Sequence, residues 1–194
     1  MYGDPHYYTY DGIRIDYQGE CRYVASKTCD DNTHFNFTVI IKQEKRYYGR
    51  YKFFGDRVTF IEYVDIYIDD VNIRLLKNGG LEVDGGTQYV PYLALTGSGV
   101  PYTVYSDKEG IAVLTNEFQV WYEGDWHATI TVNRAMFGGK LCGLCADCDS
   151  DPNNDLITSD LVDLAPRTDL TLAEKHAYLG NSWQVPADDE LGLG

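Results

Sequence analysis

The sequence predicts a mainly β fold in which antiparallel strands form a two-sheet β-sandwich or a flattened barrel, with one short helix near the C-terminus. Segments that alternate apolar and polar residues recur at short spacing, and turn-forming residues separate them. The chain also has 17 Tyr and 19 Gly among 194 residues, which favours strands joined by tight turns. Almost no helical pattern lies between these segments, and this arrangement is typical of sandwich folds.

Strands in the first half of the chain follow from alternation and from turn signals. Residues 35–41 place Phe, Val and Ile on one face and polar residues on the other, which predicts a half-buried strand. Residues 58–69 continue this pattern over a longer stretch. A short strand at 81–83 is predicted between the turns at 78–80 and 84–86, which both end in Gly-Gly. The residues expected to face inward from the longer strand are Val58, Phe60, Val64, Ile66 and Ile68.

The second half of the chain continues with short strands. The turn sequence Ser-Asp-Lys-Glu-Gly at 106–110 separates predicted strands at 102–105 and 111–114. Residues 118–122 and 126–132 flank Glu-Gly-Asp, which predicts a hairpin. These four strands complete the predicted sandwich.

The C-terminal region changes from strand to helix. Thr171 and Glu174 match a capping box, and Gly180 stands where a glycine would end the helix. We therefore predict a helix over about 171–179. A final strand at 181–185 would follow it, and its tryptophan would dock on the domain.

Size and charge limit the number of domains and the kinds of partner. With 44 % hydrophobic residues the chain can build one large core, so we expect a single domain over residues 1–186 and a disordered tail over 187–194. The net charge of −14 argues against nucleic acid or an anionic membrane as a partner, and it is compatible with a divalent cation. No run approaches the roughly 18 apolar residues of a membrane helix, so no membrane span is expected.

Two features bear on secretion. No signal peptide opens the sequence, so we expect a segment of a longer protein. The sequon Asn36-Phe37-Thr38 predicts glycosylation of Asn36 and gives weak support for a secreted protein, because such sequons also arise by chance.

The segment 141–166 has six Asp and no Lys or Arg. Asp147, Asp149 and Asp151 alternate like the first ligands of an EF-hand loop, but the sixth and twelfth positions lack the required Gly and Glu. The segment is therefore not an EF-hand, although its oxygen ligands still suit Ca²⁺. The alternative is a solvated acidic loop.

Five cysteines offer a second kind of chemistry. Cys142, Cys145 and Cys148 are evenly spaced, whereas Cys21 and Cys29 lie far away in the sequence. Zinc or an iron–sulfur cluster would need a fourth ligand nearby, and a redox Cys-x-x-Cys would need a βαβ unit. Structural disulfides of an extracellular domain fit better. Because the number is odd, one thiol is free or pairs outside this sequence.

Several motifs in the same order resemble the von Willebrand factor type D domain, of the kind found in mucins, zonadhesin, tectorins and Fc-binding-like proteins. Gly-Asp-Pro-His-Tyr-x-Thr-Tyr-Asp-Gly at 3–12 and Tyr-Gln-Gly-Glu-Cys-x-Tyr-Val at 17–24 resemble its opening. Leu-Cys-Gly-Leu-Cys at 141–145, Asp-Leu at 155–156 and Gly-Asn-Ser-Trp at 180–183 resemble its close. The resemblance spans nearly the whole chain.

The resemblance implies a secreted two-sheet domain with a disulfide-stapled calcium loop. In such domains one Ca²⁺ is held between the first hairpin and the acidic loop. More than 130 residues separate these two segments here, so one ion would join distant parts of the chain. The implied ligands are Asp11, Asp147, Asp149, Asn154, Asp155 and a backbone carbonyl near Pro152.

The resemblance also implies a pairing of the cysteines. It suggests a Cys29–Cys142 disulfide. Cys145 would pair with a cysteine upstream of the first motif, which this sequence lacks, so Cys145 is expected to be unpaired here. Cys21 would pair beyond the last motif, and Cys148 replaces a residue that is often aromatic, so we predict a replacement Cys21–Cys148 bridge.

The predicted function is that of a non-catalytic, calcium-binding structural or adhesive module in a larger extracellular glycoprotein. Its partners would be neighbouring domains of the parent protein or other protein copies. The alternatives are Cys-x-x-Cys-assisted disulfide exchange during multimer assembly, and membership of a luciferase or a lipid-transport protein that contains such a domain. In some mucin relatives the Asp–Pro bond of the first motif cleaves itself, and Asp4–Pro5 is the corresponding bond.

Overall fold

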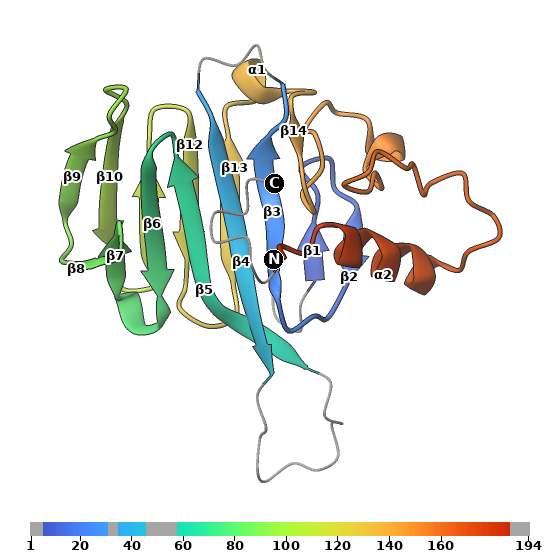
Figure 1. Cartoon of the computed structure of the whole chain (residues 1–194), viewed down its shortest axis with the longest axis horizontal. Helices are drawn as coiled ribbons and strands as arrows, with labels where there is room; N and C mark the ends of the chain where they lie inside the picture. The colour runs from blue at the N-terminus through green and yellow to red at the C-terminus, as the bar shows by residue number, and fades with distance from the viewer. Residues whose placement is uncertain (1–5, 31–34, 46–57, 187–194) are drawn as a thin grey trace, which may run out of the picture.

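The computed structural model describes residues 6–30, 35–45 and 58–186, whose strands form three antiparallel sheets (Figure 1). In the largest sheet, strands that follow one another in the sequence are mostly neighbours in space. Its strands in spatial order are β14 (Leu141–Cys142), β3 (Arg22–Thr28), β4 (Phe37–Lys45), β5 (Thr59–Ile68), β6 (Val71–Leu76), β7 (Leu81–Val83) and β8 (Gly86–Gln88). The predicted mainly β, antiparallel architecture is confirmed.

A second sheet has five strands, each paired with its neighbour in the sequence. Its strands in spatial order are β13 (Ala128–Val132), β12 (Phe118–Tyr122), β11 (Ile111–Leu114), β10 (Pro101–Ser106) and β9 (Tyr92–Leu95). All four strands predicted between residues 102 and 132 lie in this sheet, although β13 begins two residues later than expected.

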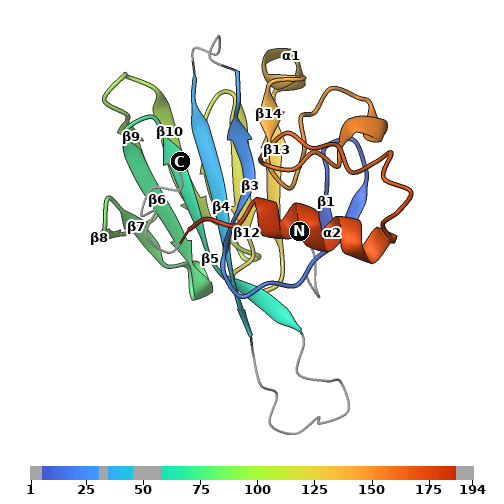
Figure 2. The same ribbon diagram turned by 45° about the vertical axis from the view of Figure 1, so that its right-hand side comes forward.

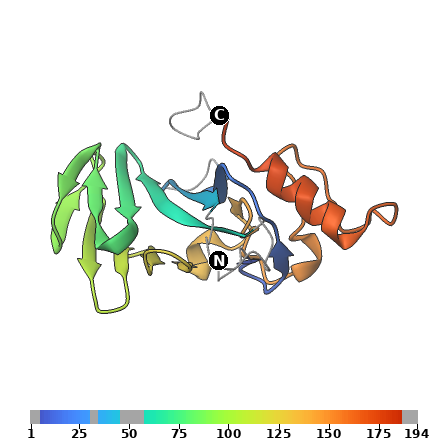
Figure 3. The ribbon, with the colours of Figure 1, turned by 90° about the horizontal axis from the view of Figure 1, so that it is seen from below.

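The two larger sheets share one hydrophobic core. Phe37 of β4 stacks on Phe118 of β12 with their ring centroids 4.6 Å apart. The hydroxyl of Tyr122 in β12 donates to the carbonyl of Ile61 in β5 at 2.9 Å. In the view from below, these sheets form separate layers (Figure 3).

The third sheet is a hairpin of β1 (His6–Tyr8) and β2 (Arg14–Asp16), which corrects the expected two-sheet layout. These strands have only three residues each and pair with one another rather than with a larger sheet. In the turn between them, the Thr9 amide donates to the Ile13 carbonyl at 2.9 Å, and Gly12 has a φ of 98°. The hairpin lies close to α2, the helix near the C-terminus (Figure 2).

Strand β5 is buried more completely than its alternation predicted. Four of its five expected inward residues are buried, whereas Val58 precedes the strand and is only partly buried. Ile61 is buried as well. A β-bulge between Lys42 and Gln43 shifts the pairing of β4 with β5, so one alternating pattern does not describe the whole strand.

Helix α2 (Leu172–Ser182) starts as predicted, because Thr171 and Glu174 form a complete capping box. It ends three residues later than predicted, so the assignment of Gly180 as the terminating residue is wrong. Gly180 lies inside the helix against the ring of Tyr17, and a Cβ at this position would come within 2.3 Å of that ring. Close packing therefore requires glycine here.

The predicted final strand at 181–185 is also wrong in detail. Its first two residues belong to α2, and only Gln184 forms an isolated bridge, with Tyr23 of β3. The predicted docking is nevertheless present: Trp183 is 7 % exposed, and its indole Nε1 donates to the Ile157 carbonyl at 3.1 Å.

Three further short helices complete the described chain: α1 (Arg134–Phe137), η1 (Lys77–Gly79) and η2 (Pro152–Asn154). Within the described residues, no helix combines the length and apolar character needed to cross a membrane. The expected tail at 187–194 and the Asp4–Pro5 bond lie outside these residues, and the domain boundary at 186 stays a prediction.

Candidate metal centre

Three carboxylates from two distant segments meet at one place. Asp11 comes from the turn between β1 and β2, and Asp147 and Asp149 come from the loop that follows β14. One oxygen from each lies within 4.8 Å of the others. The two segments are also joined at their backbones, because the Tyr10 amide donates to the Cys145 carbonyl at 2.9 Å.

The acidic loop is shaped by its own side chains. The Asp149 amide donates to Asp147 Oδ1 at 3.3 Å, and the Asp151 amide donates to Asp149 Oδ1 at 2.6 Å. Asp151 Oδ1 in turn accepts from the Asn153 amide at 3.0 Å, at the start of η2. Such Asp-to-backbone bonds stabilise successive tight turns, so the predicted Asp spacing specifies the loop as well as its charge.

Backbone conformation within the loop alternates. Ala146, Cys148 and Ser150 have φ values of 61°, 66° and 82°, in the left-handed region that non-glycine residues rarely adopt. Asp147 and Asp149 lie between them. Strain of this kind persists where surrounding structure over-determines it, and it often accompanies functional sites.

Three side-chain oxygens of the predicted ligand set are buried without a hydrogen-bond partner. They are Asp11 Oδ2, Asn154 Oδ1 and Asp155 Oδ1. Buried oxygens without donors are costly unless something else satisfies them. Asn154 faces the cluster, because its amide nitrogen donates to Asp149 Oδ2 at 3.0 Å. Since all five predicted side-chain ligands offer oxygen, the residues fit a hard cation such as Ca²⁺ rather than zinc.

Electrostatics in the cluster oppose full ionisation. The pKa of Asp155 is raised to about 6, chiefly by burial, with the carboxylates of Asp11, Asp147 and Asp149 also raising it and a hydrogen bond from Thr9 lowering it. The pKa of Asp147 is raised by burial and then by Asp149. A bound cation would relieve this repulsion.

The remaining predicted ligand is a carbonyl near Pro152. This residue is exposed and begins η2, where its ring suits the first helical position. The carbonyl's role stays a prediction. Asn36, the predicted glycosylation site, is exposed immediately before β4.

One disulfide anchors the base of the acidic loop. Cys29, just after β3, is bonded to Cys142 in β14, and their Cα atoms lie 5.9 Å apart. The resemblance implied this pair. The bond and the pairing of Leu141 with Thr28 hold the loop against the largest sheet.

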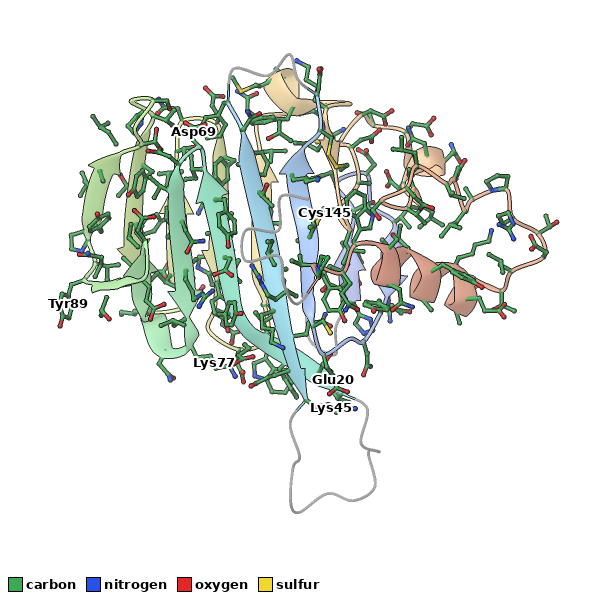
Figure 4. All side chains as sticks on the ribbon, in the orientation of Figure 1. Glu20, Lys45, Asp69, Lys77, Tyr89 and Cys145 are labelled. Carbon is green, nitrogen blue, oxygen red and sulfur yellow. A yellow bond between two sulfur atoms is a disulfide. The ribbon has the colours of Figure 1, made fainter. Side chains whose placement is uncertain are left out.

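The predicted Cys21–Cys148 bridge is not present, and this corrects the sequence interpretation. Both residues are free thiols, as is Cys145, which lies beside β3 (Figure 4). Cys21 precedes the first residue of β3, whereas Cys148 follows β14, which pairs with the opposite end of β3 at Lys27. The two cysteines therefore lie near different ends of the strand.

Two residues of the site escaped the sequence interpretation. Thr9 donates from its hydroxyl to Asp155 Oδ2 at 2.5 Å, and Arg134 contacts Asp11 at 2.9 Å. Thr9 belongs to a motif of the resemblance, which was a signal that it mattered. No spacing in the sequence connects Arg134 to Asp11, because 123 residues separate them.

The fold and this cluster define a disulfide-linked, mainly β domain with an all-oxygen candidate cation site. The family model of the von Willebrand factor type D domain matches residues 1–162, which is most of the chain. The chain therefore belongs to the von Willebrand factor type D domain family, as the sequence motifs suggested.

Similar proteins cover nearly all of this chain with a small part of their own length. Zonadhesin from Sus scrofa is 33 % identical over 191 residues, covering 97 % of this chain and 7 % of its own. The IgGFc-binding protein from Homo sapiens is 30 % identical over 199 residues, covering 98 % and 3 % respectively. Alpha-tectorin from Gallus gallus is 29 % identical over 189 residues, covering 96 % and 8 %. The chain thus spans less than a tenth of the length of these relatives.

Proposed function

We propose that this domain is a calcium-stabilised, non-catalytic structural or adhesive module of a larger extracellular glycoprotein. The observation that carries the proposal is the set of buried, unpartnered oxygens of Asp11, Asn154 and Asp155 beside the carboxylates of Asp147 and Asp149. These five side chains, with a carbonyl near Pro152, would hold the ion. Calcium supplies no reaction step in this role and acts through rigidity.

The ion would stabilise the folded domain because it joins two segments that are far apart in the sequence. Asp11 and the acidic loop are more than 130 residues apart in the sequence. Binding an ion only in the folded state would stabilise that state, by on the order of a few kcal/mol for a well-bound ion. It would also replace repulsion among the carboxylates by shared attraction to one cation.

Location and partners are inferred from family and chemistry. The Cys29–Cys142 disulfide supports an oxidising, extracellular environment. The small share of each relative that the chain covers supports neighbouring domains as partners, with other protein copies as the alternative. An exposed Asn36 is compatible with glycosylation.

Disulfide exchange is the less favoured alternative. It requires an accessible thiolate, but Cys145 is 8 % exposed and burial raises its pKa to about 11. Cys142, the other cysteine of the Cys-x-x-Cys motif, is already bonded to Cys29. The luciferase and lipid-transport alternatives gain no support from the described site.

The test is a thermal melt of the oxidised protein, first with chelator and then with increasing Ca²⁺. We expect the melting temperature to rise with Ca²⁺ in the wild type and not in Asp149→Ala. Asp169→Ala is the matched control, because Asp169 is an exposed carboxylate paired with Arg167 outside the cluster. An unchanged wild-type melting temperature at millimolar Ca²⁺ would refute the proposal.

A further inference from the structure

The guanidinium of Arg134 bridges the same two segments that the proposed ion would join. Arg134 is the first residue of α1. Its Nη2 donates to Asp11 Oδ1 at 2.9 Å and to the carbonyl of Tyr10 at 3.1 Å, and both acceptors belong to the hairpin turn. Its Nη1 donates to the hydroxyl of Ser150 in the acidic loop. One side chain of the protein thus already places a positive charge between hairpin and loop.

The two oxygens of Asp11 have separate roles in this geometry. The side chain of Asp11 is only 2 % exposed, and Arg134 occupies Oδ1. The other oxygen, Oδ2, is buried without a partner. A cation held by Oδ2 can therefore coexist with Arg134, and it would lie close to a fixed like charge.

We infer that Arg134 is a permanent cation beside the site that lowers its calcium affinity and, in the metal-free domain, holds the hairpin turn against the acidic loop. This inference rests on the proposed calcium function. In the metal-free state, Arg134 offsets part of the repulsion among the acidic groups and ties Asp11 to the loop. In the bound state, its charge opposes that of Ca²⁺. Because it favours the metal-free state more than the bound state, it lowers the affinity of the site for calcium.

Two substitutions separate charge from geometry. Arg134→Gln removes the charge, whereas Arg134→Lys keeps the charge but loses the planar fork that reaches Asp11, Tyr10 and Ser150 together. Arg167→Gln is the matched control, because Arg167 is about as exposed as Arg134 and pairs with Asp169 outside the cluster.

The experiment is calorimetric titration of each oxidised protein with CaCl₂ alone, together with melts in chelator. We expect Arg134→Gln to bind Ca²⁺ about tenfold more tightly than the wild type, which corresponds to about 1.4 kcal/mol. Arg134→Lys should stay within about threefold of the wild-type affinity. Both variants should melt at a lower temperature than the wild type in chelator, and Arg167→Gln should match the wild type in both measurements.

The outcomes distinguish this inference from the function on which it rests. Equal or weaker calcium binding by Arg134→Gln, with normal binding by the wild type, would overturn the role of Arg134 and leave the proposed function intact. No binding by any of the proteins would overturn both. Should Arg134→Gln fail to fold in chelator, the comparison of Arg134→Lys with the wild type still decides: a tenfold gain in affinity despite the retained charge would refute the electrostatic explanation.

Discussion

The hydroxyl of Thr9 donates a hydrogen bond to Asp155 Oδ2 at 2.5 Å, although 146 residues separate the two in the sequence. Both residues are buried, and Thr9 Oγ1 also accepts from the Ile13 amide at 2.9 Å. One hydroxyl therefore shapes the hairpin turn that carries Asp11 and fixes a second predicted ligand from the other end of the chain. This hydrogen bond joins the hairpin to the acidic loop in addition to the backbone bond between Tyr10 and Cys145.

Removing that hydroxyl should destabilise the metal-free domain. Thr9→Val keeps the side-chain volume but leaves Asp155 Oδ2 and the Ile13 amide without their partner, so we expect a loss of about 1–3 kcal/mol in the free energy of unfolding. Urea denaturation in chelator measures this loss. Thr129→Val, at an exposed position of β13, is the control and should change little. Equal stability of Thr9→Val and the wild type would show that the bond contributes nothing.

Gly180→Ala tests whether helix propensity or packing decides the stability of α2. Propensity alone predicts a gain of about 1 kcal/mol for alanine inside a helix. The new Cβ would lie 2.3 Å from the Tyr17 ring, so we expect a net loss of about 1–3 kcal/mol instead. The midpoint of urea denaturation gives the sign, and a variant more stable than the wild type would contradict the packing explanation.

His176 should make the metal-free domain less stable in mild acid. It is 3 % exposed, its Nδ1 accepts from the Asp16 amide at 3.1 Å, and burial lowers its pKa, with Arg14 lowering it and Asp16 raising it. Because the folded-state pKa lies below the unfolded value of about 6.5, the unfolded chain binds more protons below that pH. This contribution to stability is present above about pH 6.5 and is lost as the pH falls.

His176→Asn isolates that contribution, because the Asn oxygen can accept from the Asp16 amide without titrating. Urea denaturation in chelator at pH 7 and pH 5 should show a less favourable change in stability on acidification for the wild type than for the variant, because other groups such as Asp155 contribute equally to both. A variant that loses as much stability as the wild type on acidification would exclude His176 as a source of the pH dependence.

Much of the fold could be predicted, because alternation and turn chemistry are local properties of the sequence. The strands expected at 81–83, 111–114 and 118–122 have those bounds in the structure. Propensity and spacing failed where a distant residue decides the local outcome. Gly180 suggested the end of a helix, but the ring of Tyr17 more than 160 residues away explains the glycine. The predicted Cys21–Cys148 bridge failed for a similar reason, because Cys21 comes just before one end of β3 and Cys148 follows β14, which pairs with the other end.

The candidate site divides in the same way. By itself, the sequence determined the β-rich class, the family, and an acidic loop whose Asp side chains build its turns, because each depends on neighbouring residues or on motif order. The family motifs already implied that Asp11 meets the carboxylates of the loop, which lie beside it in the structure. Only the tertiary structure showed that the guanidinium of Arg134 reaches Asp11 as well. Such contacts form when the whole core packs, and the chain closures of more than 120 residues that they require leave no periodic trace in the sequence.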